Sequence, residues 1–250
     1  MTTFDASKVV LDAPAPEATD RLANLAMTVY SAATVSGDPA EVLVRSLAAD
    51  ALGEPTAAEL SWADLIAAST GFPLLGTGRV APTYPALMWD GARLAAVAPD
   101  RRWAPLLAAL AAAPAGTGLD RVGRAVTAGL CVLDATDDLL GTEPLAYLTS
   151  ATLAAAAAAS LVGPAAGADL ASVLDLAASL QVFTPDARHV GWAAGHAVAS
   201  GWLAATLPAD AITPMPGSVV HTLSVAAGRP VVAAGDVAPR TVDDLLGHLS

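Results

Sequence analysis

The chain has 250 residues, a formal net charge of −12 at pH 7, and 54% apolar but only 14% charged residues. So much apolar sequence supplies a large core and excludes disorder for most of the chain. The acidic balance, with no basic patch or arginine-rich stripe, disfavours nucleic acid and anionic membrane surfaces as partners.

The predicted elements begin with an extended arm over residues 1–16, which contain two prolines and few periodic apolar positions. Apolar periodicity with start and stop signals then predicts successive helices within residues 17–207. These helices are expected over residues 17–36, 38–53, 56–68, 84–97, 102–113, 120–140, 144–162, 168–180 and 187–207. Residues 71–82 are rich in glycine, proline and threonine and are expected to form a loop.

The texture of the sequence changes after Pro208. Residues 218–225 and 231–234 contain β-branched pairs, which predict short strands. Residues 241–249 are expected to form a last short helix. The predicted organisation is therefore an N-terminal arm (1–16), one helical domain (17–207) and an irregular C-terminal tail (208–250).

The expected fold class is mainly α, an alanine-rich helical bundle. Alanine has the best helix propensity but little surface to bury, so the helices are expected to approach closely. The surplus apolar surface also favours an oligomer interface, and a homodimer is the default expectation. Residues 151–163 are apolar but short and dominated by alanine, which indicates a buried helix rather than a membrane span.

The chain has one cysteine and one lysine, which limits the catalytic mechanisms it can use. Cys131, the only cysteine, lies among apolar residues and is expected to be a buried small hydrophobe. Lys8 is the only lysine and lies in the arm, so lysine bases and Schiff bases have essentially no candidate. No signal peptide is expected, and the expected location is cytoplasmic. No phosphate loop, nucleophile elbow or zinc spacing occurs, so neither a cofactor nor a metal is expected.

Four polar and aromatic residues form one stripe of the last long predicted helix. His189, Trp192, His196 and Ser200 are spaced by three, four and four residues. The two histidines lie roughly 10 Å apart along the helix axis, too far apart for a single-metal pair. The stripe is either a half-buried packing surface or a pocket wall that offers a histidine acid or base.

The same helix carries two glycines four residues apart, Gly191 and Gly195. This small-xxx-small spacing permits close approach of a second helix. We expect these glycines to serve packing rather than function.

Two arginines stand at a predicted helix start. Asp100 precedes Arg101 and Arg102, and an acid at that position caps the helix and complements its dipole. The arginines form either a solvated face or a clamp for a substrate carboxylate. A separate acidic helix end is expected to be solvated and comprises Asp134, Asp137 and Asp138.

Three aromatic residues cluster near the predicted central loop, namely Tyr84, Trp89 and Trp103. They either line a pocket or pack in the core, and large aromatic side chains more often do the latter.

The order of the segments resembles the large helical domain of the MmgE/PrpD family, which includes 2-methylcitrate dehydratase, cis-aconitate decarboxylase and iminodisuccinate epimerase. Residues 74–79 resemble the segment before the family's Asn-Gly turn, and Asp90-Gly91-Ala92 resembles that turn. Residues 149–163 and 168–180 resemble a small-residue helix and its successor. Residues 195–207 resemble in outline a Gly-Arg-Ala-Ala-x-x-Gly segment, so the resemblance covers most of residues 20–207.

The chain departs from the family pattern at its functional positions. Asp100 is retained from an Asp-x-Asp-Asp-Thr run, but other motif positions are replaced by Ala98, Arg102, Pro144, Ala146 and Ala193. The family's following His-Pro-Ser is absent, and the chain continues directly to Trp103. Val190 stands near the position of the family's lysine. Residues 208–250 are also too few to form the family's C-terminal lid domain. The resemblance therefore implies the fold more strongly than the activity.

What the resemblance implies is removal of a proton next to a carboxylate, followed by loss of water or carbon dioxide or by reprotonation. The candidate catalytic residues are His189 or His196 as base and Tyr84 or Asp90 as acid. The candidate substrate-binding residues are Arg101, Arg102, Trp89, Trp103 and Trp192. The expected enzyme is a cofactor-independent lyase or isomerase acting on a small specialised metabolite as a dehydratase, isomerase or cyclase. The alternative is a non-catalytic helical subunit or small-molecule-binding protein on the same scaffold.

Overall fold

The computed structural model describes residues 2–4, 54–97, 101–114, 117, 119–140, 144–164, 169–181, 190–208 and 211–233. This part of the chain is mainly helical, as predicted. Its helices are α4 (Ala57–Ile66), α5 (Thr83–Val97), α6 (Trp103–Ala112), α7 (Leu119–Leu140), α8 (Pro144–Val162), α9 (Leu170–Ser179), α10 (Val190–Thr206) and α11 (Ser218–Ala227). Its strands are β1 (Thr2–Phe4), β2 (Phe72–Leu74), β3 (Arg79–Ala81) and β4 (Val231–Ala233).

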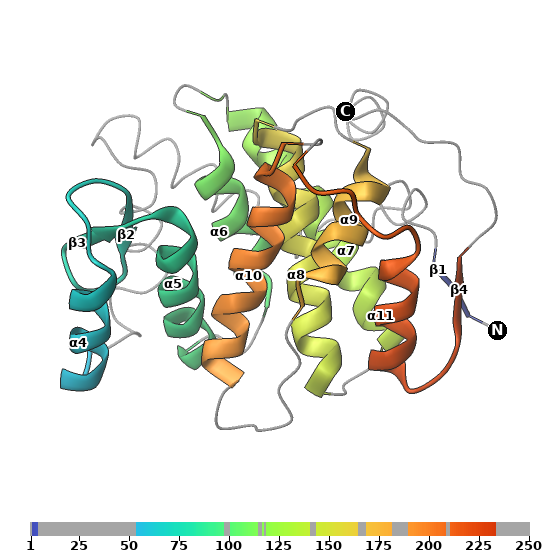
Figure 1. Ribbon diagram of the computed structural model, residues 1–250, viewed down its shortest axis with the longest axis horizontal. Coiled ribbons are helices and arrows are strands. Elements are labelled where there is room, and N and C mark those ends of the chain that lie inside the picture. The colour runs from blue at the N-terminus through green and yellow to red at the C-terminus, as the bar shows by residue number, and fades with distance from the viewer. Residues whose placement is uncertain are drawn as a thin grey trace.

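Helix α8 forms the centre of the bundle, and α6, α7, α9, α10 and α11 all pack against it. Helix α5 packs on the far side of α10, so the hairpin and α4 lie at one end of the molecule and α11 at the other (Figure 1). Every residue from Ala151 to Gly163 is buried, which confirms the predicted buried helix. Among the described residues, no helix combines the length and the apolar character that crossing a membrane requires.

The helices predicted between residues 56 and 207 are confirmed, with ends that differ by a few residues. Helix α4 shows the local cause most clearly, because Thr56 and Glu59 form a capping box that satisfies backbone N–H groups at its start. The helices predicted over residues 17–36, 38–53 and 241–249 lie outside the described residues. The buried position predicted for Cys131 is also confirmed, and burial raises the pKa of its thiol to about 11.

The strand predicted over residues 218–225 is wrong, because this segment forms α11. A carboxylate from α9 holds the start of that helix. Asp175 accepts hydrogen bonds from the backbone N–H groups of Gly217 (2.9 Å) and Val219 (2.8 Å). Gly228 ends the helix in the left-handed conformation (φ 60°), as a C-cap glycine does. The second predicted strand is confirmed as β4, which pairs in parallel with β1.

The loop predicted over residues 71–82 contains a short hairpin instead. Strands β2 and β3 pair in antiparallel register, with Phe72 opposite Ala81 and Leu74 opposite Arg79. The strands are only three residues long, so glycine, proline and threonine dominate the local composition and hide the pairing.

Helices α5 and α10 approach each other most closely at glycines. A Cβ atom added to Gly195 would overlap the backbone carbonyl of Met88, and one added to Gly91 would lie 2.7 Å from the Cα of Gly195. Gly191 faces α5 with more room, since an added Cβ would lie 3.5 Å from the carbonyl oxygen of Ala92. The packing role is therefore confirmed for Gly195, whereas Gly191 makes only an ordinary contact.

Gly195→Ala is expected to lower the free energy of unfolding by about 1–3 kcal/mol, because backbone atoms cannot move aside for the new methyl group. Gly191→Ala is the matched control and should leave stability unchanged or raise it, since alanine is favoured over glycine in helices by about 1 kcal/mol. Urea unfolding followed by circular dichroism measures both. Equal stability of the two variants would contradict the close crossing.

Candidate functional site

The stripe on α10 meets α5 at a hydrogen-bonded histidine. The phenol oxygen of Tyr84 lies 3.0 Å from Nδ1 of His196, and Oγ of Ser200 lies 3.3 Å from Nε2. The rings of Tyr84 and His196 stand nearly at right angles, at 79°. Both side chains are half-buried, while Ser200 is buried. The structure thus brings together a phenol, an imidazole and a hydroxyl in one chain of short polar contacts.

A tryptophan extends this group towards the surface. The ring of Trp192 is parallel to that of His196, with an interplanar angle of 4° and ring centroids 6.1 Å apart. These residues lie one helical turn apart on α10, where side chains four positions apart are neighbours. Trp192 is 51% exposed. We refer to Tyr84, Trp192, His196 and Ser200 as the His196 cluster.

The environment of His196 favours a neutral imidazole. Burial lowers the pKa of His196 from its ordinary value of 6.5, and a hydrogen bond to the backbone of Leu180 partly opposes the shift. A neutral imidazole is both a hydrogen-bond donor and an acceptor, whereas an imidazolium ion is a donor only. At neutral pH the ring is therefore able to accept a proton. The other predicted histidine base, His189, lies outside the described residues.

Asp90 lies in the interior of α5, so Asp90-Gly91 is not a turn. Its side chain is fully buried, and Oδ1 accepts a hydrogen bond of 2.9 Å from the backbone N–H of Leu75. The neighbouring Trp89 donates from Nε1 to the carbonyl of the same residue at 3.1 Å. These two side chains hold both polar groups of Leu75, which fixes the hairpin connection against α5.

This position suits Asp90 to structure better than to proton transfer with a substrate. Its second oxygen, Oδ2, is buried and makes no hydrogen bond within the described part of the chain. Burial raises the pKa of Asp90 well above its ordinary value, although the hydrogen bond from Leu75 opposes the shift. The carboxyl group therefore resists ionisation at a site sealed from solvent.

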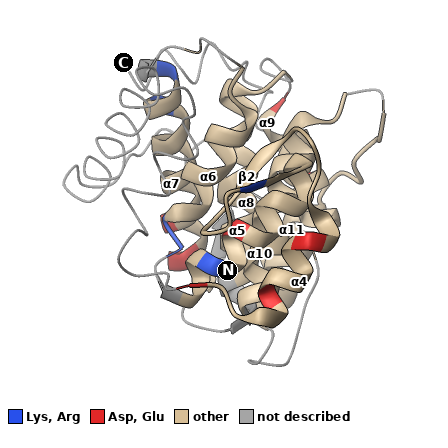
Figure 2. Cartoon of the chain, turned by 90° about the vertical axis from the view of Figure 1, so that its left-hand side faces the viewer, with Lys and Arg blue, Asp and Glu red and all other residues tan. Residues whose placement is uncertain are grey.

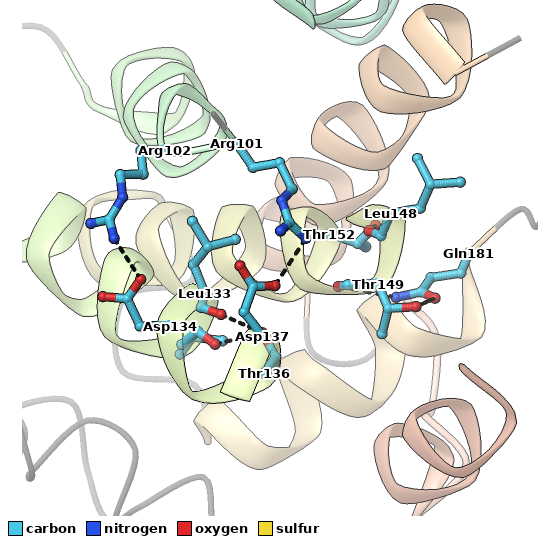
Figure 3. Close-up of polar contacts among 11 residues, drawn as sticks. Arg101, Arg102, Leu133, Asp134, Thr136, Asp137, Leu148, Thr149, Thr152 and Gln181 are labelled. Atoms are coloured by element: carbon cyan, nitrogen blue, oxygen red, sulfur yellow. Dashed lines mark hydrogen bonds and ion pairs between the residues drawn. The ribbon is translucent and has the colours of Figure 1, made fainter. Parts of the chain in front are cut away.

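The two arginines at the start of α6 form ion pairs with α7. Arg101 Nη1 lies 2.9 Å from Oδ1 of Asp137, and Arg102 Nη2 lies 3.0 Å from Oδ1 of Asp134 (Figure 3). All four side chains are between 20% and 29% exposed. The solvated acidic end expected here is therefore wrong for these two aspartates, although Asp138 is exposed as expected.

Burial and the nearby arginines act on the pKa of Asp137 in opposite directions. Burial raises the pKa of Asp137, against the opposing effects of the Ser150 hydroxyl and of Arg101 and Arg102. Charged positions are sparse on the helices (Figure 2). Two further arginines in the described part also pair with carboxylates, Arg93 with Glu59 and Arg79 with Asp64. The structure thus places Arg101 and Arg102 in helix-joining pairs.

The remaining predicted aromatic residues belong to the core. Trp89 is fully buried and packs against Trp62 with ring centroids 5.1 Å apart, and Trp103 is 5% exposed. Trp103 lies beside the crossing of α5 and α10, since a Cβ added to Gly91 would lie 3.3 Å from its ring. Of the five predicted substrate-binding residues, Trp192 alone is both exposed and in contact with a predicted catalytic residue among those described.

Several polar contacts have no signal in the sequence. Gln181, at the end of α9, accepts a hydrogen bond from the Thr149 hydroxyl (3.1 Å) and donates one to the Thr149 carbonyl (3.4 Å). Asp175 likewise reaches from α9 to α11. Both contacts join residues more than thirty positions apart, so no local pattern indicates them. Within the described segments, no group of three or more His, Cys, Asp or Glu side chains is arranged to hold a metal ion.

Comparison with known proteins gives no match to this chain. No protein-family model fits the sequence, and no curated protein or solved structure is significantly similar to it.

Asp90→Asn is expected to remove a pH dependence of stability. Because the folded pKa of Asp90 is raised, the native state holds a proton that the unfolded state has released. This contribution is complete below about pH 3.8 and is lost as the pH rises through the folded pKa, by about 1.4 kcal/mol for each pH unit between the unfolded and folded pKa. Urea unfolding between pH 4 and pH 8 should show the variant gaining on the native protein as pH rises. The exposed Asp138→Asn is the control, and a difference independent of pH would contradict the expectation.

His196 is expected to titrate below pH 6.5, because its partly buried ring disfavours the charged form. The ring proton signals of His196 in NMR spectra, assigned with the His196→Asn variant, report the midpoint directly. A midpoint at or above 6.5 would show that burial does not control this ring.

Proposed function

We propose that the protein is an acid/base enzyme acting on a small organic molecule, a lyase or isomerase whose site is the His196 cluster. The observation that carries the proposal is the contact of 3.0 Å between the Tyr84 phenol and His196 Nδ1 across two helices. A half-buried phenol next to a neutral imidazole supplies a proton acceptor and a proton donor at one point, as such reactions need. A dehydration, isomerisation or cyclisation of a specialised metabolite fits this chemistry.

The contacts of the imidazole suggest how protons move. The Tyr84 phenol donates to Nδ1 in the tautomer that carries its ring hydrogen on Nε2. In that tautomer Nε2–H faces Oγ of Ser200 at 3.3 Å. In the proposed step, the phenol proton passes to Nδ1 while the phenol oxygen takes a proton from a carbon of the substrate. The products are a substrate carbanion or enolate, a neutral tyrosine and an imidazolium ion.

The geometry favours the His196 cluster over the other predicted catalytic and binding positions. Asp90 is sealed in the core, and Arg101 and Arg102 hold carboxylates of α7. Tyr84 and His196, by contrast, are half-buried and next to the exposed Trp192. Their partial exposure beside Trp192 supports this part of the surface as the place where a substrate would bind.

Solvent exchange tests this function without knowledge of the natural substrate. The protein is incubated in ²H₂O with pyruvate, cis-aconitate or 2-tetralone, and NMR spectroscopy follows deuterium entering the carbon next to the carbonyl or carboxylate. Tyr84→Phe and His196→Asn should each slow protein-dependent exchange by about 100-fold or more. His221→Asn, which removes an exposed histidine of α11, is the matched control. Exchange at the native rate in both site variants would overturn the proposal.

A non-catalytic helical subunit or binding protein is the second candidate, and specific observations favour it. Both ring nitrogens of His196 already have partners within the chain, and the two arginines are held in ion pairs. Ile212 and Met215 also expose apolar side chains before α11, which suits a protein partner. Absence of protein-dependent exchange with all three compounds would favour this candidate. In either case we propose a cytoplasmic homodimer, in keeping with the surplus of apolar sequence.

A further inference from the structure

The chain has five tryptophans, all of which lie in the described part, and Trp192 differs from the other four. Trp89 and Trp103 are buried, and Trp62 and Trp202 are half-buried, whereas Trp192 is 51% exposed. A large apolar ring left in water loses the free energy that its burial would provide. Its exposure therefore calls for an explanation in terms of what the ring contacts.

The ring of Trp192 is held in a defined orientation despite its exposure. It lies parallel to the imidazole of His196, and His196 is in turn held by Tyr84 and Ser200. An aromatic surface that is already oriented loses little conformational freedom when a ligand covers it. Flat π-bonded groups stack on such a surface, and aromatic pairs contribute beyond the area that they bury.

The orientation of the rings also relates a stacked molecule to the proton-transfer groups. A flat molecule lying on Trp192 is parallel to the imidazole as well, because the two protein rings differ by only 4°. A group carried on such a ring therefore has a fixed orientation relative to the imidazole. A saturated, puckered molecule offers no such alignment.

We propose that the His196 cluster takes a substrate with a flat, unsaturated or aromatic ring that stacks on the exposed surface of Trp192. This inference rests on the proposed function for what happens next to the ring, but the stacking itself is measurable without turnover. Trp192 binds and orients the substrate, while Tyr84 and His196 move its proton.

The test uses 2-naphthol and decahydro-2-naphthol, which share a hydroxyl group and carbon skeleton but differ in flatness. Binding to ¹⁵N-labelled protein is measured by the shift of the Trp192 indole N–H signal and by saturation transfer to the probe. We expect 2-naphthol to bind about tenfold more tightly than its saturated counterpart. Trp192→Leu should weaken 2-naphthol binding by about tenfold, with Trp192→Phe losing less.

Two controls isolate the site. Leu65→Ala removes an apolar side chain that is 83% exposed on α4, and it should leave 2-naphthol binding unchanged. Thermal unfolding should change little in Trp192→Leu, because about half of the residue is already in solvent and leucine also favours the helix. Equal affinity for the two probes, or native affinity in Trp192→Leu, would overturn the stacking proposal.

The two proposals fail in different ways. Tyr84→Phe keeps Trp192 and the contact of Ser200 with His196, so it should still prefer 2-naphthol to decahydro-2-naphthol while losing solvent exchange. If Trp192→Leu abolishes binding but Tyr84→Phe and His196→Asn exchange deuterium at the native rate, the stacking surface stands and the acid/base function falls. If the exchange is lost in those two variants while both probes bind alike, the function stands and the flat-ring preference falls.

Discussion

The contact between Gly91 and Gly195 sets the distance between α5 and α10, and the His196 cluster depends on that distance. Gly195 sits against the backbone of Met88, one turn along α5 from Tyr84, while His196 is the next residue of α10. A larger residue at the crossing would separate the helices and lengthen the gap that the phenol spans. The partly buried hydrogen bond between Tyr84 and His196 therefore depends on glycine at both positions of the helix crossing. The packing residue Gly195 and the hydrogen-bonding residue His196 are therefore neighbours on α10.

The scarcity of charge has its own structural effect. Several partly buried charged side chains in the described segments pair across elements, as Arg101 does with Asp137 and Arg93 with Glu59. Such pairs are weak sources of net stability, but they discriminate strongly against arrangements that would leave one charge alone. Asp175 serves a comparable purpose without a cation, because it satisfies backbone N–H groups at the start of α11. In a bundle built from nearly interchangeable alanine helices, these contacts specify which helices become neighbours.

Much of the helical framework is predictable from the sequence, because its signals are local. Thr56 and Glu59, three residues apart, form the capping box of α4. The alanine-rich periodic segments that follow are separated by glycines and prolines. The α10 stripe is also predictable, since a helix of any origin aligns Trp192, His196 and Ser200. The pairing of His196 with Tyr84 is not, because 112 positions separate them and only tertiary packing brings them together.

The wrong predictions have the same physical origin. The β-branched pairs of residues 218–225 favour a strand, but the cap that stabilises α11 comes from Asp175 on another helix. Nothing in the local sequence shows that the end of α7 lies beside Arg101. Local sequence patterns predict an element reliably where the residues that stabilise it are also close in sequence.

The alanine interior of α8 has a consequence for how such a sequence can change over time. Its alanines from Ala151 to Ala159 are buried, so a larger side chain is expected to cost about 1–3 kcal/mol through overpacking, and glycine weakens the helix by about 1 kcal/mol. Few residue types are therefore expected at these positions, so similarity in this segment says little about common descent. Two unrelated bundles with the same helix spacing would converge on similar alanine-rich sequences. Descendants of one ancestor would differ chiefly at their surfaces. In a protein of this kind, we expect relatedness to be visible in residues that make specific polar contacts, such as Tyr84, Asp175 and His196, rather than in the alanines of α8.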